Sequence, residues 1–72
     1  MIMTEEFEFF VYLIEAYAKH KGSTASAILN KLDKVGKTDF VFDMYEMYHS
    51  EAIENAFIDI DSLITTGKPA WL

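Results

Sequence analysis

Apolar residues recur every three or four positions along most of the chain, the spacing of one face of an α-helix. The clearest stretch is residues 51–66, whose apolar side comprises Ile53, Ala56, Phe57, Ile60, Leu63 and Ile64. Glu54, Asn55 and Asp61 occupy its other side. The same spacing predicts three further helices over residues 5–21, 24–35 and 39–49, and a tail without periodicity over residues 67–72.

Residues that favour helix ends stand between these segments. Hydroxyl side chains, which cap helix N-termini by accepting backbone N–H bonds, stand at Thr4, at Ser23 or Thr24, at Thr38 and at Ser50. Glycines, which adopt the left-handed backbone of a helix C-terminus, stand at Gly22, Gly36 and Gly67. The chain is therefore expected to be all-α: a single small domain over residues 1–72, with four helices and short connections.

The charge of the chain argues against nucleic-acid binding. The net charge is −6, from twelve acidic residues and six lysines without any arginine, whereas nucleic-acid binders neutralise phosphates with cations. Residues 39–49 would be the recognition helix of a helix-turn-helix protein, yet they display Asp39, Asp43 and Glu46. Five of the lysines lie in residues 19–37, which could complement the acidic remainder or steer an acidic partner.

The composition also bears on localisation. No cysteine is present, so the chain forms neither a disulfide nor a thiolate metal site, which is typical of a reducing compartment. The longest apolar run, residues 9–14, is far shorter than the roughly 18 residues that a membrane span needs. We expect a cytoplasmic protein that does not insert into a membrane.

Metal and catalytic motifs are sparse. Glu46 and His49 form one Glu-x-x-His pair, but di-iron bundles use that pair twice together with two further glutamates. The only other histidine is His20, no serine lies in a Gly-x-Ser-x-Gly turn, and no glycine-rich loop could hold a phosphate. We therefore expect a protein that is not an enzyme and has no metal or other cofactor.

The junction between the third and fourth predicted helices gathers the remaining polar candidates. His49 would close one helix near its free carbonyl groups, and Ser50 would open the next as its N-cap. Asp59 borders the apolar side of residues 51–66 and could reach back toward this junction. The favoured interpretation is structural, with these residues fixing the angle between two helices. The alternative is a small-ligand or metal site made by Tyr45, His49 and Asp59.

The helix predicted over residues 5–21 carries more apolar surface than one buried face requires. Beside its main apolar stripe, Phe9, Leu13 and Ala16 form a second stripe on another side. Two explanations are open: the helix is central and covered on most sides, or the second stripe faces a partner. The second predicts a homodimer with this helix at the contact. Trp71, the only tryptophan, is expected to be at least partly buried on the core or on a partner.

Three stretches are similar to a known family. They are FVYLIEAYAKHKGSTASAILNKL, TDFVFDMYEMYHS and FIDIDSLI, and the similarity extends over residues 7–64. With them the chain resembles the bacterial domain of unknown function 3791 family, a group of short uncharacterised proteins. The resemblance implies no activity, cofactor or site residue; it implies an association with a partner protein, in an antitoxin-like or regulatory role. We expect a non-enzymatic protein-interaction module that binds another protein or itself.

Overall fold

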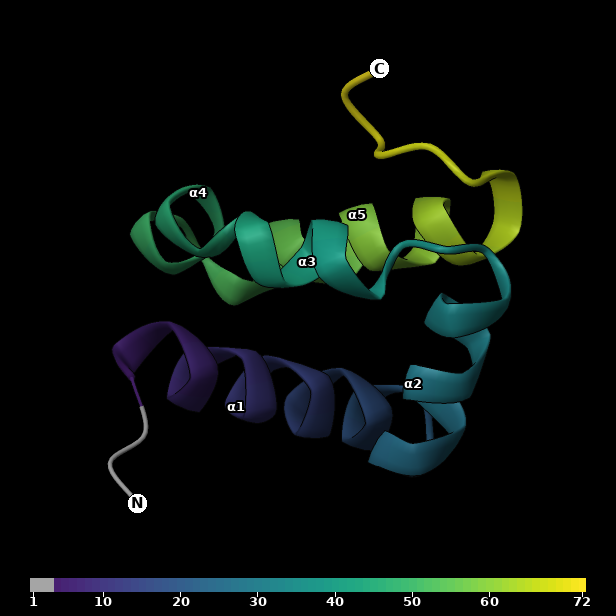
Figure 1. Cartoon of the computed structure of the whole chain (residues 1–72), viewed down its shortest axis with the longest axis horizontal. Helices are drawn as coiled ribbons and strands as arrows, with labels where there is room; N and C mark the ends of the chain where they lie inside the picture. The colour runs from purple at the N-terminus through teal and green to yellow at the C-terminus, as the bar shows by residue number, and fades with distance from the viewer. Residues whose placement is uncertain (1–3) are drawn as a thin grey trace.

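The computed structural model describes residues 4–72, and these residues form five helices and no strand. The helices are α1 (Glu5–His20), α2 (Ala25–Lys34), α3 (Thr38–Asp43), α4 (Tyr45–Ser50) and α5 (Ile53–Thr66). Figure 1 shows α1 along one side, α3, α4 and α5 along the other, and α2 joining the two sides at one end. The all-α prediction is confirmed; residues 1–3 of the predicted domain lie outside the described residues.

Five of the predicted helix ends are present: the N-caps at Thr4 and Thr24, and the left-handed glycines Gly22, Gly36 and Gly67. The Thr4 hydroxyl accepts the Phe7 backbone N–H at 3.1 Å, and the Thr24 hydroxyl accepts that of Ala27 at 3.2 Å. Gly67 ends α5 with a φ of 78°, where its N–H donates to the Leu63 carbonyl oxygen. A residue with a Cβ would be strained in this left-handed conformation, so glycine permits the chain to turn back here.

Two of the predicted N-caps are wrong. Thr38 is already the first residue of α3, and its hydroxyl donates to the Asp33 carboxylate instead of accepting a backbone N–H. Ser50 is the last residue of α4, and its hydroxyl donates to the Glu46 carbonyl oxygen at 2.6 Å. Ala52 occupies the N-cap position of α5, which has no side-chain cap. In both cases the helix boundary lies one or two residues away from the position that the sequence suggested.

The helix expected over residues 39–49 is interrupted at Met44, which separates α3 from α4. Neither glycine nor proline stands at this position, so the break does not come from local sequence preference. Its effect is a change of direction: α3 packs against α1 and α2, whereas α4 packs against α1 and α5. Because no local helix-breaking residue accounts for the break, we attribute it to these different packing partners.

Helix α1 is the central element, because it contacts all four other helices. Leu13 is fully buried within the single chain, and Phe9 and Ala16 are partly covered. The prediction that Leu13 contacts a second subunit is therefore wrong, and the second apolar stripe of α1 faces its own helices. The buried apolar residues are Leu13, Ile14, Tyr17, Ala18, Ile28, Leu32, Val41, Tyr48, Ala56, Ile60 and Leu63.

None of the helices in residues 4–72 has both the length and the apolar character required to cross a membrane.

Candidate functional site

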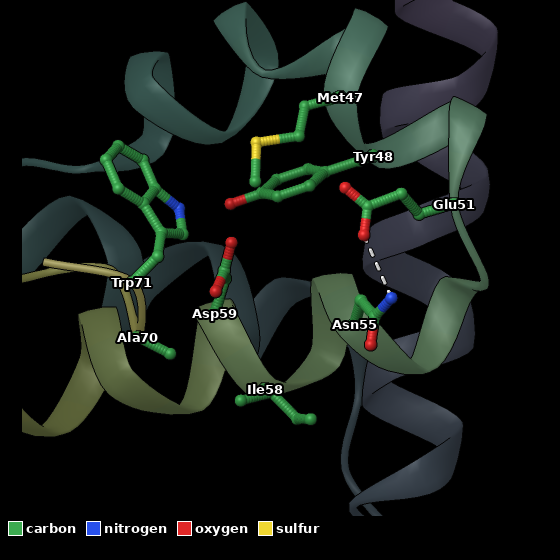
Figure 2. A pocket seen from close by; sticks show the side chains of 8 residues that line it. All are labelled: Met47, Tyr48, Glu51, Asn55, Ile58, Asp59, Ala70 and Trp71. Atoms are coloured by element: carbon green, nitrogen blue, oxygen red, sulfur yellow. Dashed lines mark hydrogen bonds between the residues drawn. The ribbon is translucent and has the colours of Figure 1, made fainter.

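A pocket of about 330 Å³ lies between α4, α5 and the C-terminal tail (Figure 2). Its lining combines α4, the connection that follows it, one side of α5 and the tail that returns over α5. The eight lining residues are Met47, Tyr48, Glu51, Asn55, Ile58, Asp59, Ala70 and Trp71. Segments distant in sequence thus meet in one hollow, which we call the α4–α5 pocket.

Tyr48 and Asp59 supply the buried polar groups of this pocket. Asp59 is only 5% exposed because it lies on the buried side of α5, between Ala56 and Ile60. The ring of Tyr48 packs in the core, and its hydroxyl points toward the Asp59 carboxylate in Figure 2. Among the described residues, the Tyr48 hydroxyl has no hydrogen-bond partner. A buried polar group without a partner is costly, which makes this pair an unusual feature of so small a core.

The electrostatic character of the pocket is acidic. Asp59 and Glu51 are both carboxylates, and no lysine or histidine is among the lining residues. Asn55 donates from its side-chain nitrogen to Glu51 at 2.9 Å, which holds that carboxylate beside the opening. Burial, together with the neighbouring Asp59 carboxylate, raises the pKa of Tyr48 above its ordinary value. Tyr48 therefore keeps its proton near neutral pH and remains able to donate a hydrogen bond.

Large apolar side chains surround the opening. Met47, Ile58 and Trp71 line the pocket and are all exposed, Ile58 at 57% and Trp71 at 52%. Trp71 is positioned by the tail, in which Pro69 is buried. Its indole nitrogen is directed toward the interior of the pocket in Figure 2. Trp71 forms one wall of the pocket, but its side chain is exposed, contrary to the prediction that it is at least partly buried.

The structure does not unite the residues of the predicted ligand site. Tyr45 and His49 stack on each other at 4.2 Å between ring centroids, and the Phe9 ring meets both edge-on. His49 also donates from Nδ1 to the Tyr45 carbonyl oxygen at 2.7 Å. Neither residue lines the α4–α5 pocket, where Asp59 lies opposite Tyr48 instead. Asp59 does reach back to α4, but the residue opposite it is Tyr48, which precedes His49.

The alternative site predicted from the sequence was also considered as a metal site. Within residues 4–72 there is no cluster of three or more histidine, aspartate or glutamate side chains placed to hold a metal ion.

A second hollow contains the other buried tyrosine, Tyr17, whose hydroxyl has a hydrogen-bond partner. Tyr17 donates its hydroxyl proton to Asp61, which also forms an ion pair with Lys21 at 3.0 Å. Burial acts to raise the pKa of Asp61, but the hydrogen bonds from Tyr17 and Lys21 and the charge of Lys21 outweigh it and lower that pKa. These groups satisfy one another across α1 and α5, so this hollow does not require a ligand.

The sequence did not indicate Tyr48, Met47 or Ile58 as functional residues. The ring of Tyr48 lies in the core, and nothing in the spacing of the residues singles out its hydroxyl. The available signal was Asp59, because an acidic residue at the edge of an apolar helix face is seldom buried without a partner.

Replacing Tyr48 by phenylalanine should leave the free energy of unfolding unchanged or raise it by up to about 1 kcal/mol. The hydroxyl loses its hydration on folding without gaining a protein partner, so its removal relieves a cost. Urea denaturation of the two proteins measures this. Tyr17→Phe is the matched control and should lose about 0.5–3 kcal/mol, since its hydroxyl bonds Asp61. An equal loss in both variants would show that the Tyr48 hydroxyl is bonded in the folded chain.

Comparison with known proteins gives a family and no relative of known activity. A family model described as "Protein of unknown function (DUF3791)" matches residues 8–66, which include α2 to α5 and most of α1. No curated protein and no solved structure matches the chain. The matched segment contains Tyr48 and Asp59, whereas Trp71 lies beyond it.

Proposed function

This chain belongs to the DUF3791 family of proteins of unknown function, and we propose that it is a non-enzymatic module that binds another protein. The binding surface in this proposal is the α4–α5 pocket with its apolar rim. An antitoxin-like or regulatory role is the form of this function that we favour. In this role the chain would act through the protein that it binds.

The observation that carries this proposal is the combination of an apolar rim with a buried polar centre. Protein-interaction hot spots place a few aromatic or large apolar anchors around groups that lose water on binding. Met47, Ile58 and Trp71 supply such a rim, and Tyr48 and Asp59 supply the centre. A partner that fills the pocket would cover exposed apolar surface and give the buried groups hydrogen bonds in the same step.

The chemistry of the lining favours binding over catalysis. A nucleophilic enzyme needs a nucleophile hydrogen-bonded to a base, and no serine, histidine or lysine lines this pocket. Tyr48 has a raised pKa, which makes it a hydrogen-bond donor rather than a base at neutral pH.

Affinity capture from the host cell tests the proposal with two matched variants. Ile58→Lys places a cation at the rim, next to Asp59, where it would occupy the pocket and block a partner. Tyr12→Lys makes the same change at a site of α1 with nearly equal exposure, 58% against 57%, outside the pocket. We expect one protein to be retained by the wild type and by Tyr12→Lys, and at least tenfold less of it by Ile58→Lys. Equal retention by all three would refute the proposed surface.

A second copy of the chain is the other partner that the sequence led us to expect. The mass of the purified protein in solution, measured for the wild type and for Ile58→Lys, distinguishes the two. A dimer that Ile58→Lys converts to a monomer would make the pocket a surface for self-association.

A further inference from the structure

We infer that the α4–α5 pocket receives an arginine side chain of the partner protein, whose guanidinium group binds the Asp59 carboxylate. This inference rests on the proposed function and specifies the chemistry of the group that enters the pocket. It depends on four observations: the buried carboxylate, the unpartnered hydroxyl, the absence of cations from the lining, and the aromatic wall.

Charge complementarity favours a cationic occupant. Asp59 is buried, and the only ion pair found in residues 4–72 joins Lys21 to Asp61, so no cation of these described residues neutralises Asp59. Glu51 adds a second carboxylate near the opening. A buried carboxylate is stable when it is paired and hydrogen-bonded, and an incoming cation would supply both. A neutral donor would hydrogen-bond Asp59 without neutralising its charge, and an anionic group would be repelled by it.

The arrangement of acceptors fits a guanidinium group better than an ammonium group. A guanidinium is planar and presents five N–H donors in a fixed fork, which can bond both oxygens of a carboxylate. At the centre of the pocket, the Tyr48 oxygen can accept one N–H of the guanidinium group while the Asp59 carboxylate accepts others. Glu51 can accept another donor at the opening. An ammonium group has three donors around one point and would reach fewer of these acceptors at once.

The walls of the pocket suit the rest of an arginine side chain. Trp71 lines one side of the pocket, and tryptophan is the ring with which a guanidinium group interacts most favourably. Met47 and Ile58 provide apolar surface for the methylene stem and for neighbouring residues of the partner. The volume of about 330 Å³ is at the lower end of the range for ligand pockets, about 300–1,000 Å³, which suits a single side chain.

The composition of the chain indicates that this arginine comes from another protein. All six cationic residues are lysines and there is no arginine, so a second copy cannot provide a guanidinium group. The single tryptophan gives the pocket its own spectroscopic reporter, because one indole N–H resonance arises from Trp71 alone.

Nuclear magnetic resonance titration of the whole chain with three amino-acid derivatives tests the inference. The probes are the N-acetyl amides of arginine, of lysine and of citrulline, which is the neutral isostere of arginine. We expect arginine amide to shift the Trp71 indole resonance and the Asp59 backbone resonance to saturation. Lysine amide should bind at least about threefold more weakly, because it makes fewer directed bonds. Citrulline amide should give no saturable shift.

The Asp59→Asn variant completes the titration, since it keeps the shape of the side chain and removes its charge. We expect it to fold with wild-type helicity and to lose the response to arginine amide. Citrulline binding as tightly as arginine, or an unchanged response in Asp59→Asn, would overturn the inference. So would the absence of any saturable shift with arginine amide. These outcomes are separate from the capture experiment, which can succeed with a partner that inserts another kind of side chain.

Discussion

Replacing Leu13 by alanine is expected to lower the free energy of unfolding by about 2–5 kcal/mol, the range for truncation of a fully buried leucine. Leu13 is completely inaccessible and lies on α1, the helix that contacts all of the others. A domain of 72 residues has a total stability of about 4–11 kcal/mol at typical values per residue. This one substitution should therefore remove a large part of the stability of the fold.

Chemical denaturation followed by helical circular dichroism measures this effect. Tyr12→Ala, one position away on the exposed side of α1, is the control and should change stability by less than about 0.5 kcal/mol. A Leu13→Ala protein of near wild-type stability whose mass in solution is halved would contradict the assignment of Leu13 to the core. It would return this residue to the interface that the sequence suggested.

The position of Leu13 shows what a helical pattern can and cannot determine. Spacing of apolar residues indicates that α1 has two apolar sides, but not which neighbours cover them. Leu13 and Phe9 would stand at the same sequence spacing whether they packed against a second subunit or against α4 and α5. The sequence therefore predicted the helix and its ends closely, while the choice between a central helix and a dimer contact required the packing of the other helices.

The break at Met44 was not predictable for a related reason. Local signals for helix ends are glycine, proline and capping side chains, and none of these stands at Met44. The break arises because residues before it face α1 and α2, while residues after it face α1 and α5. Contacts between distant segments thus override local preference, and only the assembled structure contains them.

The α4–α5 pocket was partly visible in the sequence. Asp59 was recognised as an acidic residue near an apolar helix face, and Trp71 was expected to be at least partly buried. Their meeting with Tyr48 depends on the angle between α4 and α5 and on the path of the tail after Pro69. Neither this angle nor the path of the tail produces a periodic pattern in the sequence. The prediction joined Asp59 to Tyr45 and His49, because all three appeared to lie near one junction, whereas the structure turns Tyr45 and His49 toward Phe9.

Replacing Asp59 by asparagine is expected to weaken the binding of the captured partner at least about 30-fold. Removal of one member of a buried, hydrogen-bonded charge pair at an interface costs about 2–5 kcal/mol, and 2 kcal/mol corresponds to about 30-fold in affinity. The asparagine side chain has nearly the same size and shape as aspartate, so the pocket and the fold should be preserved. The loss should therefore appear in binding and not in helicity.

Calorimetric titration of the partner into the wild type, Asp59→Asn and Asp43→Asn tests the central claim, that the buried Asp59 carboxylate binds a cation of the partner. Asp43→Asn makes the same chemical change at an exposed position of α3 outside the pocket. We predict a loss of at least about 30-fold for Asp59→Asn and less than about twofold for Asp43→Asn. Binding by Asp59→Asn that stays within about twofold of the wild type would contradict the claim. Equal weakening in the two variants would also contradict it, because the effect would then come from net charge and not from the pocket.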